Sequence, residues 1–282
     1  MKYVKHIFSL IKFSHTIFAL PFALASMLVA SNGFPPLRTV LLILACMVTA
    51  RTTGMAFNRY ADAAIDARNP RTAIREIPRG IVSRRFALLL SLISATLFLL
   101  FASQLNRLCL LLSPIALFFL FFYSYTKRFT FLSHLFVGLV LGIAPVAAWV
   151  AVTGEWALQP ILLGLGVLFW VAGFDIIYAT LDEHFDKKEG LHSLVARYGI
   201  RKALLVSRLF HLLTILFFAG FGWVVNAGPA YWLGLLVTAG LLFYEQRLVK
   251  PDDLSRVNAA FFTMNGYVSM AFLAGVALSV LI

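Results

Sequence analysis

The apolar run at residues 131–152 reads FLSHLFVGLVLGIAPVAAWVAV and contains no charged side chain. A helix needs about 20 apolar residues to cross the hydrocarbon core of a bilayer, so this run is long enough to span a membrane. Eight further apolar runs lie at 14–31, 38–57, 86–105, 108–124, 159–181, 204–224, 229–244 and 259–281. The sequence therefore predicts an all-α, multi-pass membrane protein with nine transmembrane helices.

The composition agrees with a membrane protein and excludes two other classes. Of the 282 residues, 61% are hydrophobic and 13% are charged, with a mean hydropathy of +0.89. An average soluble domain is about 45–50% apolar and about 25% charged, so a soluble globular enzyme is excluded. A disordered chain is excluded as well, because it would have few aromatic residues and many charges. Cys46 and Cys109 lie in separate apolar runs, which argues against a disulfide framework.

The net charge of +12 comes from 24 Lys and Arg against 12 Asp and Glu. In a soluble protein this excess would suggest nucleic acid, but in a membrane protein basic residues collect in cytoplasmic loops, so we expect no nucleic-acid partner. With the N-terminus inside, the cytoplasmic segments contain Lys2, Lys5, Lys12, the run from Arg59 to Arg85, Lys127, Arg128, the cluster from Lys187 to Lys202, Arg247, Lys250 and Arg256. The opposite side has only Arg38 and Arg107, so the charges predict a cytoplasmic N-terminus.

Two acidic motifs lie at the cytoplasmic ends of predicted spans. Residues 58–66 read NRYADAAID, which places Asn58, Asp62 and Asp66 at i, i+4 and i+8. If the helix of the second span continues, these three side chains form one stripe with a turn between neighbours. Like charges at this spacing repel each other, so the stripe indicates a counter-ion.

The second motif, at residues 175–186, reads DIIYATLDEHFD. Asp175, Tyr178, Asp182 and Asp186 are spaced i, i+3, i+7 and i+11, which predicts one helical face. A single D-x-x-x-D pattern is as well explained by a solvated helix end, but two copies on equivalent spans favour a shared ion. Ligands that are all oxygen favour Mg²⁺, which proteins hold through one or two carboxylates together with substrate phosphates.

Basic residues follow the first acidic motif in the segment NPRTAIREIPRG at residues 69–80. Pro70 and Pro78 interrupt helix on both sides, so we expect a loop or a short helix over the acidic site. Arg71 and Arg75 at i and i+4 are candidates for a diphosphate clamp, and Lys127 in the next cytoplasmic loop is a third candidate. The alternative is that these cations serve only to keep their loops inside. The remaining candidates for substrate contact are Arg59, Tyr123, Arg128 and His15, of which His15 could meet an aromatic acid.

Taken in chain order, the motifs are N-x-x-x-D-x-x-x-D, R-T-x-x-R, Y-x-x-x-K-R and D-x-x-Y-x-x-x-D-x-x-x-D. This order resembles the UbiA superfamily of intramembrane aromatic prenyltransferases, and the likeness covers nearly the whole chain. It implies a single domain over residues 1–282, with nine transmembrane helices around a central cavity under cytoplasmic cap loops. It also implies a bacterial inner membrane, with the active site on the cytoplasmic side.

The resemblance further implies Mg²⁺-dependent transfer of a polyprenyl group from its diphosphate to a ring carbon of a small aromatic acid. Asp62, Asp66, Asp182 and Asp186, with Asn58, would hold the ion, while Asp175 and Tyr178 would orient the acceptor or steady a carbocation. Within the superfamily the chain is similar to 4-hydroxybenzoate polyprenyltransferases of quinone synthesis. The strings FNRYAD and DARNPRTAIREIP at residues 57–62 and 66–78 are more similar to the menaquinone branch that uses the futalosine route.

Other classes of protein explain the acidic residues less well. A cation-coupled transporter also places acids in its spans, but transporter sites usually lie near the bilayer midplane rather than at helix ends. A CDP-alcohol phosphotransferase would need D-G-x-x-A-R before its D-x-x-x-D, and a soluble prenyl synthase would need D-D-x-x-D. Neither string occurs in this chain.

Overall fold

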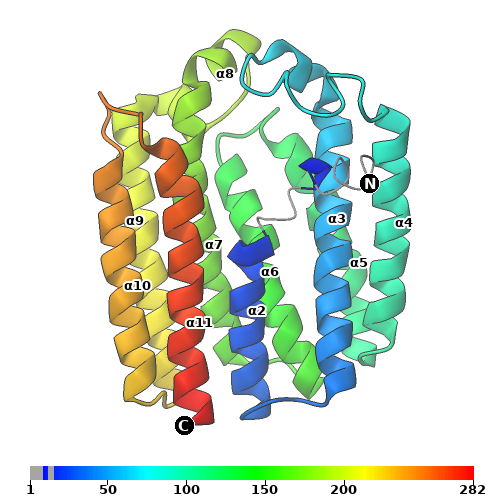
Figure 1. Ribbon diagram of the computed structural model, residues 1–282, viewed down its shortest axis with the longest axis vertical. Coiled ribbons are helices and arrows are strands. Elements are labelled where there is room, and N and C mark those ends of the chain that lie inside the picture. The colour runs from blue at the N-terminus through cyan, green and yellow to red at the C-terminus, as the bar shows by residue number, and fades with distance from the viewer. Residues whose placement is uncertain (1–8, 12–15) are drawn as a thin grey trace. The chain divides into compact units, whose positions relative to one another are not determined.

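The computed structural model describes residues 9–11 and 16–282. Its long helices are α2 (Thr16–Ser31), α3 (Leu37–Arg68), α4 (Arg84–Ser103), α5 (Arg107–Thr126), α6 (Ser133–Thr153), α7 (Leu158–Ala179), α9 (Leu194–Val224), α10 (Pro229–Leu248) and α11 (Asn265–Leu281) (Figure 1). Shorter elements are the 3₁₀ turn η2 (Thr180–Asp182), α8 (Glu183–Glu189) and the π-helical turn η3 (Ala259–Met264). In the described part of the chain the sole β-type pairing is an isolated bridge between Lys250 and Asp253. The predicted all-α class is confirmed.

Seven helical segments of the described residues are long and apolar enough to cross a membrane. They are Leu37–Arg68, Arg84–Ser103, Arg107–Thr126, Ser133–Thr153, Leu158–Glu189, Leu194–Val224 and Ala259–Leu281. The predicted first span corresponds to α2, which has only 16 residues, and the predicted eighth span corresponds to α10. The α10 helix has Glu245, Gln246 and Arg247 near its C-terminal end and is not among the seven segments. An integral membrane protein is supported, and the count of nine spans remains a prediction.

The chain divides into two compact units, residues 1–16 with 37–125 and residues 17–36 with 126–282. In the first unit α3 and α4 pack side by side along their length (Figure 1). Ser91 of α4 donates a hydrogen bond to the Thr53 carbonyl (2.9 Å), and Tyr123 of α5 donates one to the Gly54 carbonyl (3.2 Å). Neighbouring helices therefore contact α3 just before its acidic stripe begins.

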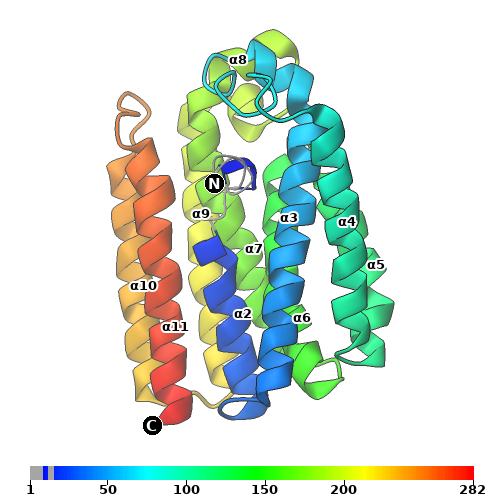
Figure 2. The ribbon, with the colours of Figure 1, turned by 45° about the vertical axis from the view of Figure 1, so that its right-hand side comes forward.

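The second unit is built on α7, which packs against α6 on one side and α9 on the other. The helices α10 and α11 lie beside each other in both ribbon views (Figure 2). Its core is aromatic, with Phe22, Trp170, Phe218 and Phe272 fully buried and in ring contact. A rigid core of this kind fixes the end of α7, from which the second acidic motif extends.

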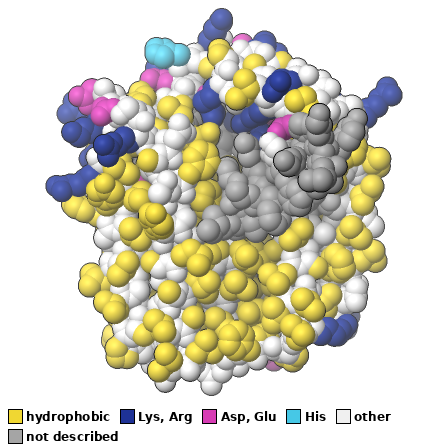
Figure 3. Space-filling model, in the orientation of Figure 1, with side chains coloured by type: hydrophobic (Ala, Val, Ile, Leu, Met, Phe, Trp, Pro, Cys, Tyr) yellow, Lys and Arg dark blue, Asp and Glu magenta, His cyan; other side chains and the backbone are white. Residues whose placement is uncertain are grey.

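The outer faces of both units are hydrophobic, and yellow side chains dominate the helical surface seen in Figure 3. On α4 the exposed residues Leu89, Leu92, Ile93, Leu97 and Leu100 follow helical spacing and form one apolar stripe. On α10 the exposed apolar residues are Trp232, Leu233, Leu236, Val237, Phe243 and Tyr244. Apolar faces of this extent are rare on soluble monomers, whereas contact with lipid accounts for them.

Close packing of α6 on α7 depends on glycine at Gly138, where an added Cβ would overlap the Leu168 carbonyl oxygen. We expect Gly138→Ala to lower the free energy of unfolding by about 1–3 kcal/mol, because the obstructing atom belongs to backbone and cannot rotate away. Thermal unfolding of the purified protein in detergent measures this change. Gly240→Ala on α10 is the matched control, since no atom lies within 4 Å of the added methyl group. Equal unfolding midpoints for the two variants would contradict this account of the α6–α7 contact.

Candidate active site

The first acidic motif lies on the last turns of α3, which continues as helix to Arg68. The predicted stripe of Asn58, Asp62 and Asp66 on one helical face is therefore confirmed. Asn58 Nδ2 donates to Asp62 Oδ2 (3.1 Å) and contacts Ser124 Oγ of α5 (3.5 Å). The two aspartates are almost fully buried, with exposed fractions of 1% for Asp62 and 4% for Asp66. Buried carboxylates at this spacing require compensating cations.

Arg75 provides one such cation. Its Nη1 donates to both oxygens of Asp66, at 2.7 and 2.8 Å. The segment 69–80 forms turns, one of the two predicted alternatives of a loop or a short helix. Thr72 Oγ1 donates to the Asp66 carbonyl oxygen (3.1 Å). Asp66, a predicted metal ligand, and Arg75, a predicted phosphate-binding residue, thus form an ion pair with each other. Arg71 is half-buried in the same turn, where its backbone N–H donates to Asn69 Oδ1 (2.9 Å).

Arg59 is 4% exposed, and its Nε donates to the Leu10 carbonyl oxygen (3.4 Å). Its guanidinium lies within electrostatic range of Asp66, Arg75 and Glu76. Glu76 is itself buried and accepts a hydrogen bond from Ser9 Oγ. In the first unit, two arginines, Arg59 and Arg75, and a further carboxylate, Glu76, therefore lie near the acidic stripe. The sequence did not indicate that Glu76 is buried. Glu76 lies in a turn, and turns have no regular spacing from which burial can be predicted.

The remaining candidates for substrate contact are Tyr123 and His15. Tyr123, predicted to contact substrate, donates its hydroxyl to the Gly54 carbonyl (3.2 Å), so one of its roles is to join α5 to α3. His15 lies outside the described residues.

The second acidic motif does not lie on one continuous α-helix. Asp175 and Tyr178 lie on α7, but α7 ends at Ala179, and η2 separates it from α8, which contains Asp186. Thr180 Oγ1 donates to the Ile177 carbonyl oxygen (2.7 Å) at this junction. A 3₁₀ turn advances about 120° per residue where an α-helix advances about 100°, so three such residues rotate the following helix by about 60°. The regular α-helix that the prediction assumed is therefore interrupted at Thr180–Asp182, and the single face from Asp175 to Asp186 stays a prediction.

Asp186 lies in a polar environment made by three other segments. Its Oδ2 accepts a hydrogen bond from Ser193 Oγ (3.1 Å), and Ser193 also caps the start of α9. The His192 N–H donates to the Lys127 carbonyl oxygen (2.7 Å), which fastens the loop after α5 to this region. Lys127, His134 and Asp182 all lie within electrostatic range of Asp186. The structure therefore brings the predicted cation Lys127 to the second acidic motif; Arg128 beside it is half-buried.

His134 is a residue that sequence analysis missed. It is 3% exposed near the start of α6, and its Nδ1 is 2.7 Å from Asp175 Oδ2. His134 Nε2 is buried and makes no hydrogen bond within the described chain. The signal in the sequence was a single histidine in the otherwise apolar run at residues 131–152. A partner for Asp175 at this depth explains how a carboxylate is tolerated near the end of a span.

Within residues 9–11 and 16–282, no three His, Cys, Asp or Glu side chains are grouped as a metal site. Each unit instead supplies two aspartates of one D-x-x-x-D pattern, with Asp62 and Asp66 in the first and Asp182 and Asp186 in the second. A donor set of carboxylate oxygens alone fits Mg²⁺, which completes its coordination with water and phosphate oxygens.

Known proteins are similar to this chain in both sequence and fold. The profile of the UbiA prenyltransferase family matches residues 19–267. The 4-hydroxybenzoate octaprenyltransferase of Vibrio cholerae is 33% identical over 90% of this chain and 89% of its own length. The enzyme of the same name from Klebsiella pneumoniae is 31% identical over 90% and 87%.

Solved structures of UbiA homologs are also similar to this chain. A UbiA homolog from Aeropyrum pernix K1 superposes with a TM-score of 0.85 at 34% identity, covering 94% of this chain and 97% of that one. A UbiA homolog from Archaeoglobus fulgidus bound to GPP and Mg²⁺ has a TM-score of 0.76 at 20% identity, covering 98% and 100%, which is a likeness of fold alone. The chain belongs to the UbiA prenyltransferase family and is a prenyltransferase.

Proposed function

We propose that this enzyme transfers a polyprenyl group from a polyprenyl diphosphate to a ring carbon of a small aromatic acid, 4-hydroxybenzoate or a related acid, in quinone biosynthesis. The observation that carries the proposal is the pairing of each acidic motif with its own cation. Asp66 is bound by Arg75, and Asp186 lies within electrostatic range of Lys127. Carboxylates for a divalent ion and cations for a diphosphate are the two requirements of this leaving group.

Mg²⁺ would be held by Asp62 and Asp66 with the Asn58 amide oxygen, and by Asp182 and Asp186. When bound, the ion neutralises charge on the diphosphate as the C–O bond breaks. Arg71 and Arg75 of the first unit and Lys127 of the second are the proposed cations for the diphosphate, with Arg59 and Arg128 as further candidates. Tyr123 and Asn58 contribute polar contacts from the first unit. These side chains orient the leaving group and stabilise its charge before any bond changes.

Asp175 and Tyr178 form the α7 part of the second acidic motif and would face the aromatic acceptor. His134 fixes the Asp175 carboxylate through the 2.7 Å contact, so that the carboxylate has a defined orientation. The prenyl tail would extend into the apolar interior, which accounts for placing this chemistry in a bilayer. The concentration of Lys and Arg in alternate loops supports an N-terminus and an active site on the cytoplasmic side. The similarity to bacterial enzymes such as that of Vibrio cholerae supports a bacterial inner membrane.

The experiment is a transfer assay on the full chain in membranes, with radiolabelled geranyl diphosphate as donor and 4-hydroxybenzoate as acceptor, with and without Mg²⁺. We expect a labelled, prenylated acid that forms only in the presence of the ion. A parallel assay uses the aromatic acid of the futalosine route, which decides between the ubiquinone and menaquinone branches. Absence of prenylated product with both acids would overturn the proposed acceptor class.

A further inference from the structure

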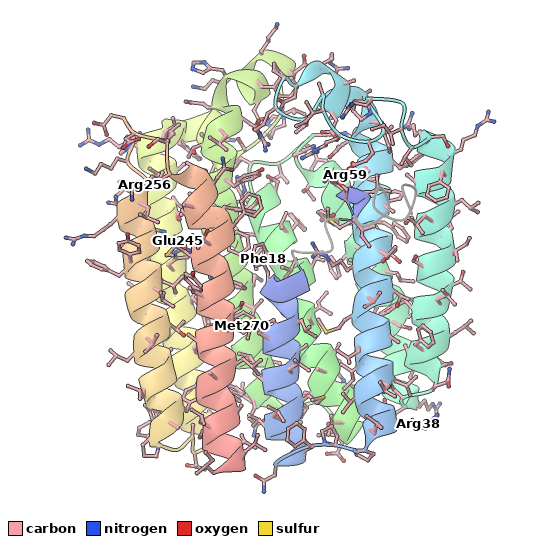
Figure 4. All side chains as sticks on the ribbon, in the orientation of Figure 1. Phe18, Arg38, Arg59, Glu245, Arg256 and Met270 are labelled. Carbon is pink, nitrogen blue, oxygen red and sulfur yellow. The ribbon has the colours of Figure 1, made fainter. Side chains whose placement is uncertain are left out.

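A buried polar network connects three helices of the second unit. Glu245 of α10, labelled in Figure 4, is fully buried. Its Oε1 accepts a hydrogen bond from Asn265 Nδ2 at the start of α11 (3.0 Å). Asn265 Oδ1 in turn accepts one from Trp170 Nε1 of α7 (2.6 Å). Glu245 Oε2 has no partner among the described residues. A buried acid with an unsatisfied oxygen costs stability, so the network requires a reason beyond packing.

Asn265 also determines the backbone of the turn before it. Its Nδ2 donates to the carbonyl oxygens of Ala260 (3.0 Å) and Phe261 (3.1 Å), both in the π-helical turn η3. A π-helical turn places these carbonyls out of register for the usual i→i+4 bonds, and the side-chain amide satisfies them. Asn265 therefore fixes the position from which the Phe261 ring extends.

Phe261 lies flat on the ring of Tyr178, with centroids 4.2 Å apart and an interplanar angle of 28°. Phe174 meets Phe261 edge-on at 5.2 Å, and Phe18 does so at 5.9 Å. We call these four rings, Phe18, Phe174, Tyr178 and Phe261, the aromatic wall. Because Tyr178 lies between Asp175 and Asp182 in the chain, the wall adjoins the second acidic motif.

We propose that Asn265 is a positioning residue that acts through Phe261 on Tyr178, and that the aromatic wall protects the allylic cation of the substrate from water. The inference rests on the proposed function, because it concerns the fate of the cation formed there. Ring faces attract cations, and the Phe261 stack holds Tyr178 in one orientation. The network of Glu245, Asn265 and Trp170 supplies the rigid support that such a wall needs.

The cation has two fates, which share a first step. The C–O bond breaks, and its electron pair remains on the diphosphate. In transfer, π electrons of the acceptor ring form a C–C bond to the cation, and the ring carbon then releases its proton to solvent. In the side reaction, a lone pair of water forms a C–O bond, and the loss of a proton gives the prenyl alcohol. The ratio of prenyl alcohol to prenylated acid therefore reports how well the wall excludes water.

The test measures this ratio for Phe261→Leu and Asn265→Leu in the full-length enzyme, with labelled geranyl diphosphate and 4-hydroxybenzoate. We expect the ratio to rise about fivefold in each variant, the size expected for loss of one cation–π contact. The double variant should show the same ratio as either single variant, because both act through one ring contact. If Asn265→Leu fails to fold, Phe261→Leu alone still tests the wall.

Phe272→Leu is the matched control, because Phe272 is also a buried ring and lies on α11, where it packs on Phe22 and Phe218. It should lower the thermal midpoint as Phe261→Leu does, yet leave the product ratio unchanged. An unchanged ratio in Phe261→Leu, or a ratio raised equally by Phe272→Leu, overturns the inference. Both results require a wild-type enzyme that transfers the prenyl group, so they are distinct from failure of the proposed function, in which no prenylated acid forms.

Discussion

Replacing Asp62 or Asp186 by asparagine is expected to reduce kcat/KM for prenyl transfer by about 1,000-fold or more, which corresponds to about 4 kcal/mol of transition-state stabilisation. Each substitution removes one negative charge from a different acidic motif while keeping the size of the side chain. The amide is a poor ligand for Mg²⁺ compared with a carboxylate, so the diphosphate would leave without charge compensation. Asp62 is 1% exposed, and its Oδ2 already accepts a hydrogen bond from Asn58, which an amide oxygen can still accept.

The measurement is a series of initial rates at increasing Mg²⁺ and donor concentration. Asp252→Asn is the matched control, because Asp252 is an exposed carboxylate outside both motifs and should retain wild-type rates. Thermal midpoints in detergent establish that the variants are folded. Full activity in Asp62→Asn or Asp186→Asn at saturating Mg²⁺ would remove that residue from the metal site.

The sequence predicted the first acidic stripe well because a regular helix has a fixed period. The apolar run of α3 ends before Asn58, but the helix itself continues for ten more residues, to Arg68. This continuation places Asn58, Asp62 and Asp66 on one face. Spacing alone determines such a face once the helix exists.

The second stripe was predicted less well because spacing carries no information on a break in the helix. The 3₁₀ turn at Thr180–Asp182 has no glycine or proline to announce it, and its threonine bonds back to the Ile177 carbonyl. Likewise, the sequence cannot show which distant residue meets a buried acid. His134 is 41 positions from Asp175, and only the packing of α6 on α7 brings them to 2.7 Å.

The sequence also could not predict the aromatic wall. The chain has 27 phenylalanines, and no local pattern distinguishes Phe261 from those that face lipid. Its position depends on the π-helical turn and on Asn265, whose three hydrogen-bond acceptors come from two separate segments. Membrane helices are apolar on all sides, so the periodic signal that separates core from surface in soluble helices is weak here.

Arg75→Met is expected to lower kcat/KM for the prenyl diphosphate by about 100-fold and to leave the KM for the aromatic acid unchanged. Arg75 donates to both oxygens of Asp66, and a guanidinium can bind a phosphate oxygen with its remaining N–H groups while keeping that pair. Arg75→Lys should recover only part of the loss, because one ammonium nitrogen cannot bind Asp66 and a phosphate oxygen through separate nitrogens as a guanidinium can. Arg79→Met is the control, as Arg79 is exposed in the same turn.

The same substitution leaves the buried Asp66 carboxylate without this partner, which costs about 1–3 kcal/mol of stability. The thermal midpoint of Arg75→Met should therefore fall, and addition of Asp66→Asn should restore it by removing the buried charge. Activity should remain lost in this double variant, because both a metal ligand and a phosphate-binding cation are missing. If the double variant recovers both the midpoint and the transfer rate, the Asp66–Arg75 pair serves the fold alone. Recovery of the midpoint without the rate shows that the pair serves the leaving group as well as the fold, and the Arg75→Met single variant then reports the share of Arg75.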